Sequence, residues 1–423
     1  MKEEFLAYAW AYRLYDGQKL CTTDGEIIQI IDPGRLNRNS GPDFENAKIK
    51  IGDAIWAGQV EIHVNASDWY AHGHETDAAY QNVILHVVFK ADAKIYIGAQ
   101  EIPTLELAQF LKLGLYDQFE SWLKSKTWIP CQNQIQSVDS LIWTSWKDRL
   151  MAERLEVKSE PVLALLSQLN GDWKMVFYHL LTENFGFKVN KTAMSIFASQ
   201  IPWKTVLRKH EDPLLIEALF FGQAGWLETE NIDEYHSQLS EAYTWIKKKH
   251  DLSPLPKSIW QTGKSRPGNF PCIRIAQLSA LLGHHRDLQK NLSKPCSLEK
   301  ATDLLTVKAG AYWEEHYDFG KKGKKNHAIL GASSLQNLLI NTLPTYWYAH
   351  ASYHGNEAQI ADIIEFLSRC KAEENQITRH WSVLGCSADN ALDSQSMIHL
   401  YNEYCSHKRC LHCQIGLHLM KQR

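Results

Sequence analysis

The stretch that decides the fold of the N-terminal region is Gly41–His63, GPDFENAKIKIGDAIWAGQVEIH. Apolar and polar residues alternate on both sides of the dipeptide Gly52-Asp53, which is typical of a turn. This alternation predicts a β-hairpin whose two strands are residues 44–51 and 55–64. The question raised by the stretch is whether its polar residues form a metal-binding active site or merely cover a solvent-facing side of the hairpin.

Three ionisable side chains meet at one end of the expected hairpin. Glu61 and His63 are two residues apart on a strand and therefore share a face, and Asp43 precedes the partner strand. Asp43 and Glu61 would suit Mg²⁺ or Mn²⁺, which prefer oxygen ligands, with His63 orienting a water molecule or acting as a base. Such a site could polarise a phosphodiester. The alternative is a hairpin with a wet polar face, because Pro-Asp is also a common turn dipeptide.

More candidate residues follow the hairpin. His72 and His74 with a carboxylate could form a zinc or iron site, although His-Gly-His is also frequent in plain loops. His86 falls inside the apolar run Asn82–Lys90 and needs a buried partner, so it is more typical of a core histidine than of a ligand. The secondary candidates around the hairpin are therefore Trp69, His72, His74 and Asp77.

The rest of the chain predicts an α+β protein. A helix over residues 2–15 and several strands up to about residue 110 indicate a mainly antiparallel or mixed sheet with a flanking helix. Beyond that point the apolar spacing is helical and strand patterns nearly vanish. The expected domains are an α+β domain at 1–110, a helical domain at 111–385, and a cysteine-rich tail at 386–423 packed on the helical domain.

The order helix, strand, Pro42-Asp43, strand, Glu61-Ile62-His63 resembles the PD-(D/E)xK nuclease superfamily. The resemblance implies a restriction-endonuclease-like fold, with Asp43 and Glu61 as metal ligands. His63 stands where that superfamily has a lysine, and a histidine supplies no permanent cation at neutral pH. The segment NASDWYAHGHETDAAY also looks similar to the aromatic and histidine segment of very-short-patch mismatch endonucleases.

The C-terminal tail contains the spacing of a metal–thiolate site. Cys410 and Cys413 are separated by two residues, Cys405 is close before them, and Cys386 precedes a helical segment. Four thiolates suit structural Zn²⁺ or an iron–sulfur cluster. The alternative is that these cysteines are buried thiols, which are common in protein cores.

Composition limits the function classes. No apolar run is long enough to span a membrane, and the N-terminus lacks the features of a signal peptide, so a cytoplasmic protein is expected. Residues 1–108 hold nine basic and sixteen acidic residues, a net charge of −7. If nucleic acid is a partner, metal ions and the C-terminal part must supply the attraction.

Two pairs of polar residues in the helical part share helix faces. Arg274 and Gln277 are three residues apart, and Asn337 and Asn341 are four apart. Blocks from the hairpin to the cysteine tail together resemble an uncharacterised bacterial family, a domain of unknown function, over the whole chain. The leading hypothesis is a metal-dependent nuclease or phosphodiesterase. The rival hypothesis is a non-catalytic binding or scaffold protein with a structural metal–thiolate site.

Overall fold

The computed structural model describes residues 1–17, 20–37, 39–206, 212–229, 232–263, 267–323 and 328–422. The chain packs as two compact units. Unit 1 comprises Met1–Trp146 with Leu400–Arg423, and unit 2 comprises Lys147–His399. The boundaries expected at residues 110 and 385 stay predictions.

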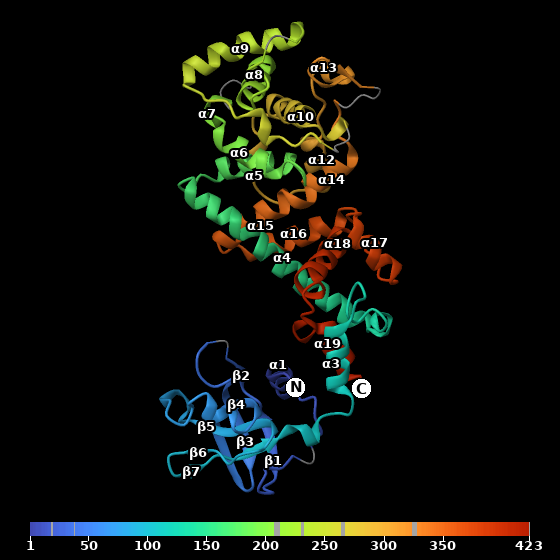
Figure 1. Cartoon of the computed structure of the whole chain (residues 1–423). Helices are drawn as coiled ribbons and strands as arrows, with labels where there is room; N and C mark the ends of the chain where they lie inside the picture. Colours follow the sequence, from blue (N-terminus) through green and yellow to red (C-terminus); the bar gives the residue numbers. More distant parts are fainter. Residues whose placement is uncertain are drawn as a thin grey trace. The chain divides into compact units, whose positions relative to one another are not determined.

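Unit 1 is built on a six-stranded sheet in the order β1-β3-β4-β5-β8, with β2 paired to β3 (Figure 1). The first three strands of this order pair antiparallel, whereas β4, β5 and β8 run parallel. The α+β class and the mixed sheet are therefore confirmed. The strands are β1 (Ile28–Asp32), β2 (Arg35–Leu36), β3 (Phe44–Ile51), β4 (Ala54–Asn65), β5 (Val83–Lys90) and β8 (Thr104–Glu106), and a separate ribbon holds β6 (Tyr96–Ile97) and β7 (Gln100–Glu101).

The predicted hairpin is the pair β3 and β4, joined at Gly52-Asp53. Gly52 has a φ of 57°, which glycine adopts without steric cost. The register runs from Ile51 opposite Ala54 and then shifts by one residue between Ala47 and Phe44. This bulge places Phe44 opposite Val60, and it keeps the alternating side chains of β3 directed into the core on both sides of the irregularity.

Helices complete unit 1. Helix α1 (Glu3–Ala11) packs against β4, and its Phe5 and Trp10 side chains are fully buried (Figure 1). The C-terminal tail is joined to the region of α3, since Lys408 Nζ donates a hydrogen bond to the carbonyl of Leu123 at 2.5 Å. The other helices of this unit are α2 (Asp68–Ala71), α3 (Leu115–Lys124), α19 (Gln414–Lys421) and the start of α4 (Ser140–Gln168).

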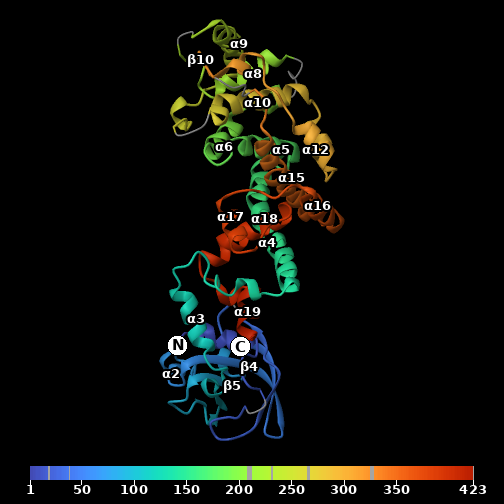
Figure 2. The ribbon, with the colours of Figure 1, turned by 90° about the vertical axis from the view of Figure 1, so that its right-hand side faces the viewer.

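Unit 2 is almost entirely helical, as expected for the later part of the chain (Figure 2). A large core in this unit is filled by leucine, isoleucine and aromatic side chains from most of the helices. No helix among the described residues is both long and apolar enough to cross a membrane. The elements are the rest of α4, α5 (Trp173–Phe185), α6 (Lys191–Gln200), α7 (Trp203–Val206), α8 (Pro213–Gln223), α9 (Glu234–His250), α10 (Pro271–His284), α11 (Leu288–Leu292), α12 (Leu298–Leu305), α13 (Tyr312–Glu315), β9 (His316–Asp318), β10 (Lys321–Lys322), α14 (Ala332–Asn341), α15 (Leu343–Tyr353), α16 (Glu357–Arg369), α17 (Gln376–Val383) and α18 (Ala391–His399).

Candidate functional site

The second half of β4 is buried on both faces. Val60 and Ile62 are fully buried on one side, and Glu61 and His63, which share the other side, are 5% and 1% exposed. The expectation of a wet polar face is therefore wrong for Glu61 and His63. Buried ionisable groups need partners, which the neighbouring strands and the segment after β4 supply.

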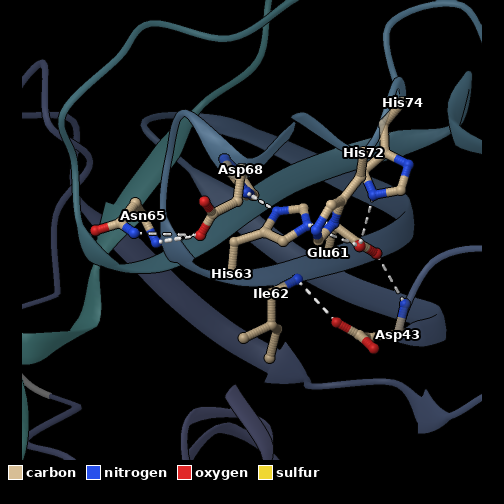
Figure 3. Close-up of polar contacts among 9 residues, drawn as sticks. Asp43, Glu61, Ile62, His63, Asn65, Asp68, His72 and His74 are labelled. Carbon is tan, nitrogen blue, oxygen red and sulfur yellow. Dashed lines mark hydrogen bonds and ion pairs between the residues drawn. The ribbon is translucent and has the colours of Figure 1, made fainter. Parts of the chain in front are cut away.

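The Asp43 and Glu61 carboxylates each accept a hydrogen bond from the backbone of the opposite segment. The Glu61 carboxylate accepts a hydrogen bond from the Asp43 N–H at 3.0 Å, and the Asp43 carboxylate accepts one from the Ile62 N–H at 3.0 Å (Figure 3). The structure therefore brings together the two carboxylates that the sequence suggested as metal ligands. The one-residue bulge in β3 makes this possible. Beyond the bulge Phe44 lies opposite Val60, and the same register sets Asp43 opposite Glu61.

Three histidine rings lie beside Glu61 (Figure 3). The potential ligand nitrogens of His63, His72 and His74 all lie within 4.8 Å of one another. His63 Nε2 is 3.1 Å from His72 Nδ1, and Glu61 Oε1 is 3.5 Å from Nε2 of both His63 and His74. His63 comes from β4, whereas His72 and His74 come from the turn after α2, so two separate segments build the cluster.

A second layer of side chains orients the histidine cluster. His63 Nδ1 lies 2.8 Å from Nε2 of the fully buried His86, which sits opposite Glu61 on β5. The ring of His74 stacks on Tyr80 with 3.8 Å between centroids, and fully buried Trp69 contacts His74 and His86 edge-on. A hydrogen bond at Nδ1 leaves Nε2 of His63 facing the cluster, which is how metal-ligating histidines are commonly held.

The carboxylates of the cluster are held together at an electrostatic cost. Burial and, next in size, the nearby Asp43 carboxylate together raise the pKa of Glu61 to about 9. Burial also raises the pKa of Asp43 to about 6, against the opposing effect of its hydrogen bond from Ile62. The buried Glu61 carboxyl and the partly buried Asp43 carboxyl repel each other when both are ionised, and a nearby cation would relieve that repulsion.

Burial favours the neutral form of His63, His74 and His86. Burial and, next in size, the neighbouring rings of His74 and His72 together lower the pKa of His63 to about 4. Burial likewise lowers the pKa of His86 to about 3, and it lowers the pKa of His74. Neutral imidazole is the form that binds metal ions. The ring nitrogens of His63, His72 and His74 are therefore candidate ligands for a metal ion, with the Glu61 carboxylate beside them.

Asp77, the remaining secondary candidate, has a local role. Its carboxylate accepts a hydrogen bond from the Ala79 N–H at 2.8 Å and caps the short 3₁₀ turn Ala78–Tyr80. This capping fixes the turn that carries Tyr80 beneath His74. Trp69 is likewise a packing residue around the cluster. Sequence reasoning recognised that His86 needs a buried partner, but nothing in the sequence identified that partner as His63.

The cysteine tail encloses a small cavity in unit 1. The sulfur-bearing residues around it are Cys405, Cys410, Cys413 and Cys131, and its volume is about 20 Å³. Cys386, the fourth ligand expected from the sequence, belongs to unit 2. Sequence spacing could not have identified Cys131, because it lies far from the tail along the chain.

The cysteines around this cavity are tightly packed, and burial affects their thiols. A side chain at Gly416 would place its Cβ 2.2 Å from the Cys410 carbonyl, so only glycine lets α19 begin this close to the cysteines. Burial raises the pKa of the Cys405 thiol, and nearby Cys413, Cys131 and Cys410 add to the effect. Among the described residues, these sulfurs do not meet the 4.8 Å spacing that the three histidines meet.

Comparison with known proteins places the chain in a family. Residues 3–376 match the model of a family described as protein of unknown function (DUF2851). The chain belongs to this family. That confirms the expected uncharacterised family over nearly the whole chain. No curated protein and no solved structure matches it. The matched residues include the complete histidine and carboxylate cluster, and the match ends before Cys405.

Proposed function

We propose that unit 1 is a metal-dependent hydrolase that cleaves phosphodiester bonds in nucleic acid. The observation that carries the proposal is the convergence of His63, His72 and His74 within 4.8 Å, beside the buried Glu61 carboxylate. Imidazole nitrogens favour ions such as Zn²⁺ or Fe²⁺ over Mg²⁺ and Mn²⁺, which prefer oxygen ligands. The cluster therefore changes the metal choice that Asp43 and Glu61 alone suggested.

The side chains of the cluster have distinct proposed roles. A metal ion at this position would polarise a phosphoryl oxygen and lower the pKa of a bound water molecule. The three histidines supply ligand nitrogens, and His86 fixes the ring of His63. Glu61 accepts the proton of the attacking water, because a nearby cation offsets its repulsion by Asp43 and favours the ionised carboxylate.

The substrate class is proposed from the order of the elements. Helix α1, strand β1, Pro42-Asp43 before β3 and Glu61-Ile62-His63 on β4 follow the order of the PD-(D/E)xK superfamily. The departure from that pattern has a physical explanation. His63 is neutral and directs Nε2 at two other rings, so it replaces a lysine cation with a further metal ligand.

The test uses the full chain purified without chelator. Metal analysis and cleavage of end-labelled DNA and RNA with added Zn²⁺, Mn²⁺ or Mg²⁺ are compared for wild type, Glu61→Gln, His74→Ala and the control Glu45→Gln. Glu45 is an exposed residue of β3. The proposal expects His74→Ala to lose metal and both cluster variants to lose cleavage, while Glu45→Gln keeps both.

Each contrary result has a defined meaning. Cleavage that survives Glu61→Gln contradicts the assigned site. Metal binding at the cluster without cleavage of either nucleic acid contradicts the hydrolase and supports the non-catalytic binding or scaffold protein. If wild type contains no metal and does not respond to added ions, the proposed metal site is contradicted.

We also propose that the cysteine cavity holds a structural metal ion, with Cys131 as the fourth ligand. The cavity of about 20 Å³ is close to the volume of one water-sized sphere, which favours a single zinc ion over an iron–sulfur cluster. Metal binding would draw the four sulfurs together. It would also stabilise the junction between Lys408 and Leu123, which joins the tail to the region of α3.

Two serine variants separate this arrangement from the one expected from sequence. Cys131→Ser should lose the bound zinc and lower the melting temperature, whereas Cys386→Ser should retain both. The reverse result would restore Cys386 as the ligand. Visible absorbance from an iron–sulfur cluster in the purified protein would contradict the zinc assignment, and equal metal content in both variants and wild type would contradict Cys131.

A further inference from the structure

Unit 2 contains a large cavity whose lining includes residues at the starts of two helices. Its volume is about 850 Å³, which lies within the range of small-molecule sites. Arg274 of α10 lines one part, and Gly331 and Ser334 line the part where α14 begins. None of these residues belongs to the histidine cluster or lines the cysteine cavity. The large cavity of unit 2 is therefore independent of the function proposed for unit 1.

Arg274 is a buried cation without a carboxylate partner among the described residues. It is 5% exposed, and its guanidinium donates to Gln277 Oε1 at 2.9 Å, Asn269 Oδ1 at 2.6 Å and Ser334 Oγ at 2.8 Å. All three acceptors are neutral, and Nε has no hydrogen-bond partner in the part of the chain that the structure describes. The guanidinium also lies 4.3 Å from the ring centroid of Phe187.

The acidic residues of the cavity are engaged elsewhere. Glu373 accepts hydrogen bonds from Gln395 at 2.6 Å and from Asn375 at 3.1 Å. Glu374 pairs with Lys371 at 3.8 Å. A buried guanidinium carries a large desolvation cost unless an anion compensates it. Burial lowers the pKa of Arg274 to about 10, which is the direct expression of that cost.

The start of α14 supplies a second cationic feature. The helix is ten residues long, and its N-cap is Gly331, which has no side chain to bond the first backbone N–H groups. A helix N-terminus carries a partial positive charge and directs N–H groups at anions. Ser334 joins the two features, because it lies in the first turn of α14 and its hydroxyl bonds Arg274.

We propose that this cavity binds a phosphorylated small molecule, with its phosphate held between Arg274 and the N-terminus of α14. The planar guanidinium and the helix start both favour phosphate over a diffuse negative charge. The volume exceeds what one phosphate group needs, so the rest of the ligand occupies the polar remainder around Gln336 and Asn337. Arg274 acts here as a binding residue, and the neutral residues around it position its side chain.

The test is titration calorimetry of the full chain with three probes, namely inorganic phosphate, a nucleoside diphosphate and succinate. Wild type and the control Arg369→Gln should bind the phosphate-containing probes, because Arg369 is an exposed residue paired with Glu365 on α16. Arg274→Gln should weaken that binding by about tenfold or more, since it removes charge-assisted hydrogen bonds.

A second variant allows the proposal to be tested even if Arg274→Gln fails to fold. Ser333→Asp adds a carboxylate at an exposed position in the first turn of α14, where negative charge stabilises a helix but repels an anion. It should leave the melting temperature unchanged or raised and still weaken phosphate binding. Absence of binding by both phosphate probes, equal binding by Ser333→Asp and wild type, or binding of succinate alone would overturn the proposal.

Discussion

A single methyl group added at Gly58 of β4 should directly disturb the histidine cluster. A Cβ at this residue would lie 2.5 Å from Ile84 Cγ2 and 2.6 Å from the carbonyl oxygen of Asn82. That oxygen also accepts the Gln59 N–H at 2.9 Å, so it cannot move away without breaking a bond between β4 and β5. Gly58→Ala therefore forces apart the two strands that carry Glu61, His63 and His86.

The expected loss of unfolding free energy lies at the upper end of the roughly 1–3 kcal/mol typical of overpacking, because one contact is with backbone. Gly17→Ala is the control, since no atom lies within 4 Å of its Cβ position, and it should change stability by no more than about 0.5 kcal/mol. Urea unfolding gives the free energies, and hydrogen–deuterium exchange of β4 and β5 amides locates the loss. Equal stability of the two variants, with unchanged exchange in β5, would refute the packing argument.

Three further predictions concern other parts of the chain. Burial and nearby Arg154 lower the pKa of Lys158 from 10.5 to about 7, so between these values only the unfolded chain keeps its proton. Stability should therefore rise with pH across that window by up to about 1.4 kcal/mol per unit, and Lys158→Met should remove this slope in urea unfolding at several pH values. Asn190→Ala removes two hydrogen bonds to the Gln261 backbone, at 3.0 and 2.8 Å, and should cost about 1–3 kcal/mol by the same assay. Gly416→Ala should reduce bound zinc measured by metal analysis, and unchanged zinc would contradict the tight approach to Cys410.

The hairpin could be predicted from sequence because its causes are local. Alternating apolar residues and a Gly-Asp turn specify β3 and β4 without reference to the rest of the chain. The shared face of Glu61 and His63 follows from strand geometry alone. The change from mainly extended segments before about residue 110 to mainly helical segments after it is equally local, which is why the α+β class and the helical later part were predictable.

The parts that sequence could not supply depend on contacts distant along the chain. The bulge between Phe44 and Ala47 is a register shift that no residue type requires, yet it sets Asp43 opposite Glu61. The parallel pairing of β4 with β5 brings His86 to His63, and an apolar run alone does not state its partner or direction. Cys131 meets the tail through packing, so the spacing of the tail gave no indication of it.

Two features indicate that the site requires an added positive charge. One is the negative charge of the N-terminal region, and the other is the histidine at the position where the PD-(D/E)xK pattern has a lysine. Residues 1–108 carry a net charge of −7, and the buried Glu61 lies close to the partly buried Asp43, with neither paired to a lysine or arginine among the described residues. A lysine at residue 63 would have supplied one positive charge, whereas the neutral His63 supplies a ligand atom. On the proposed function, a metal ion would supply the positive charge that favours ionisation of both carboxylates and attracts a phosphate. Chelation should therefore weaken nucleic-acid binding as well as cleavage, and cleavage lost with unchanged binding would place the attraction elsewhere in the chain.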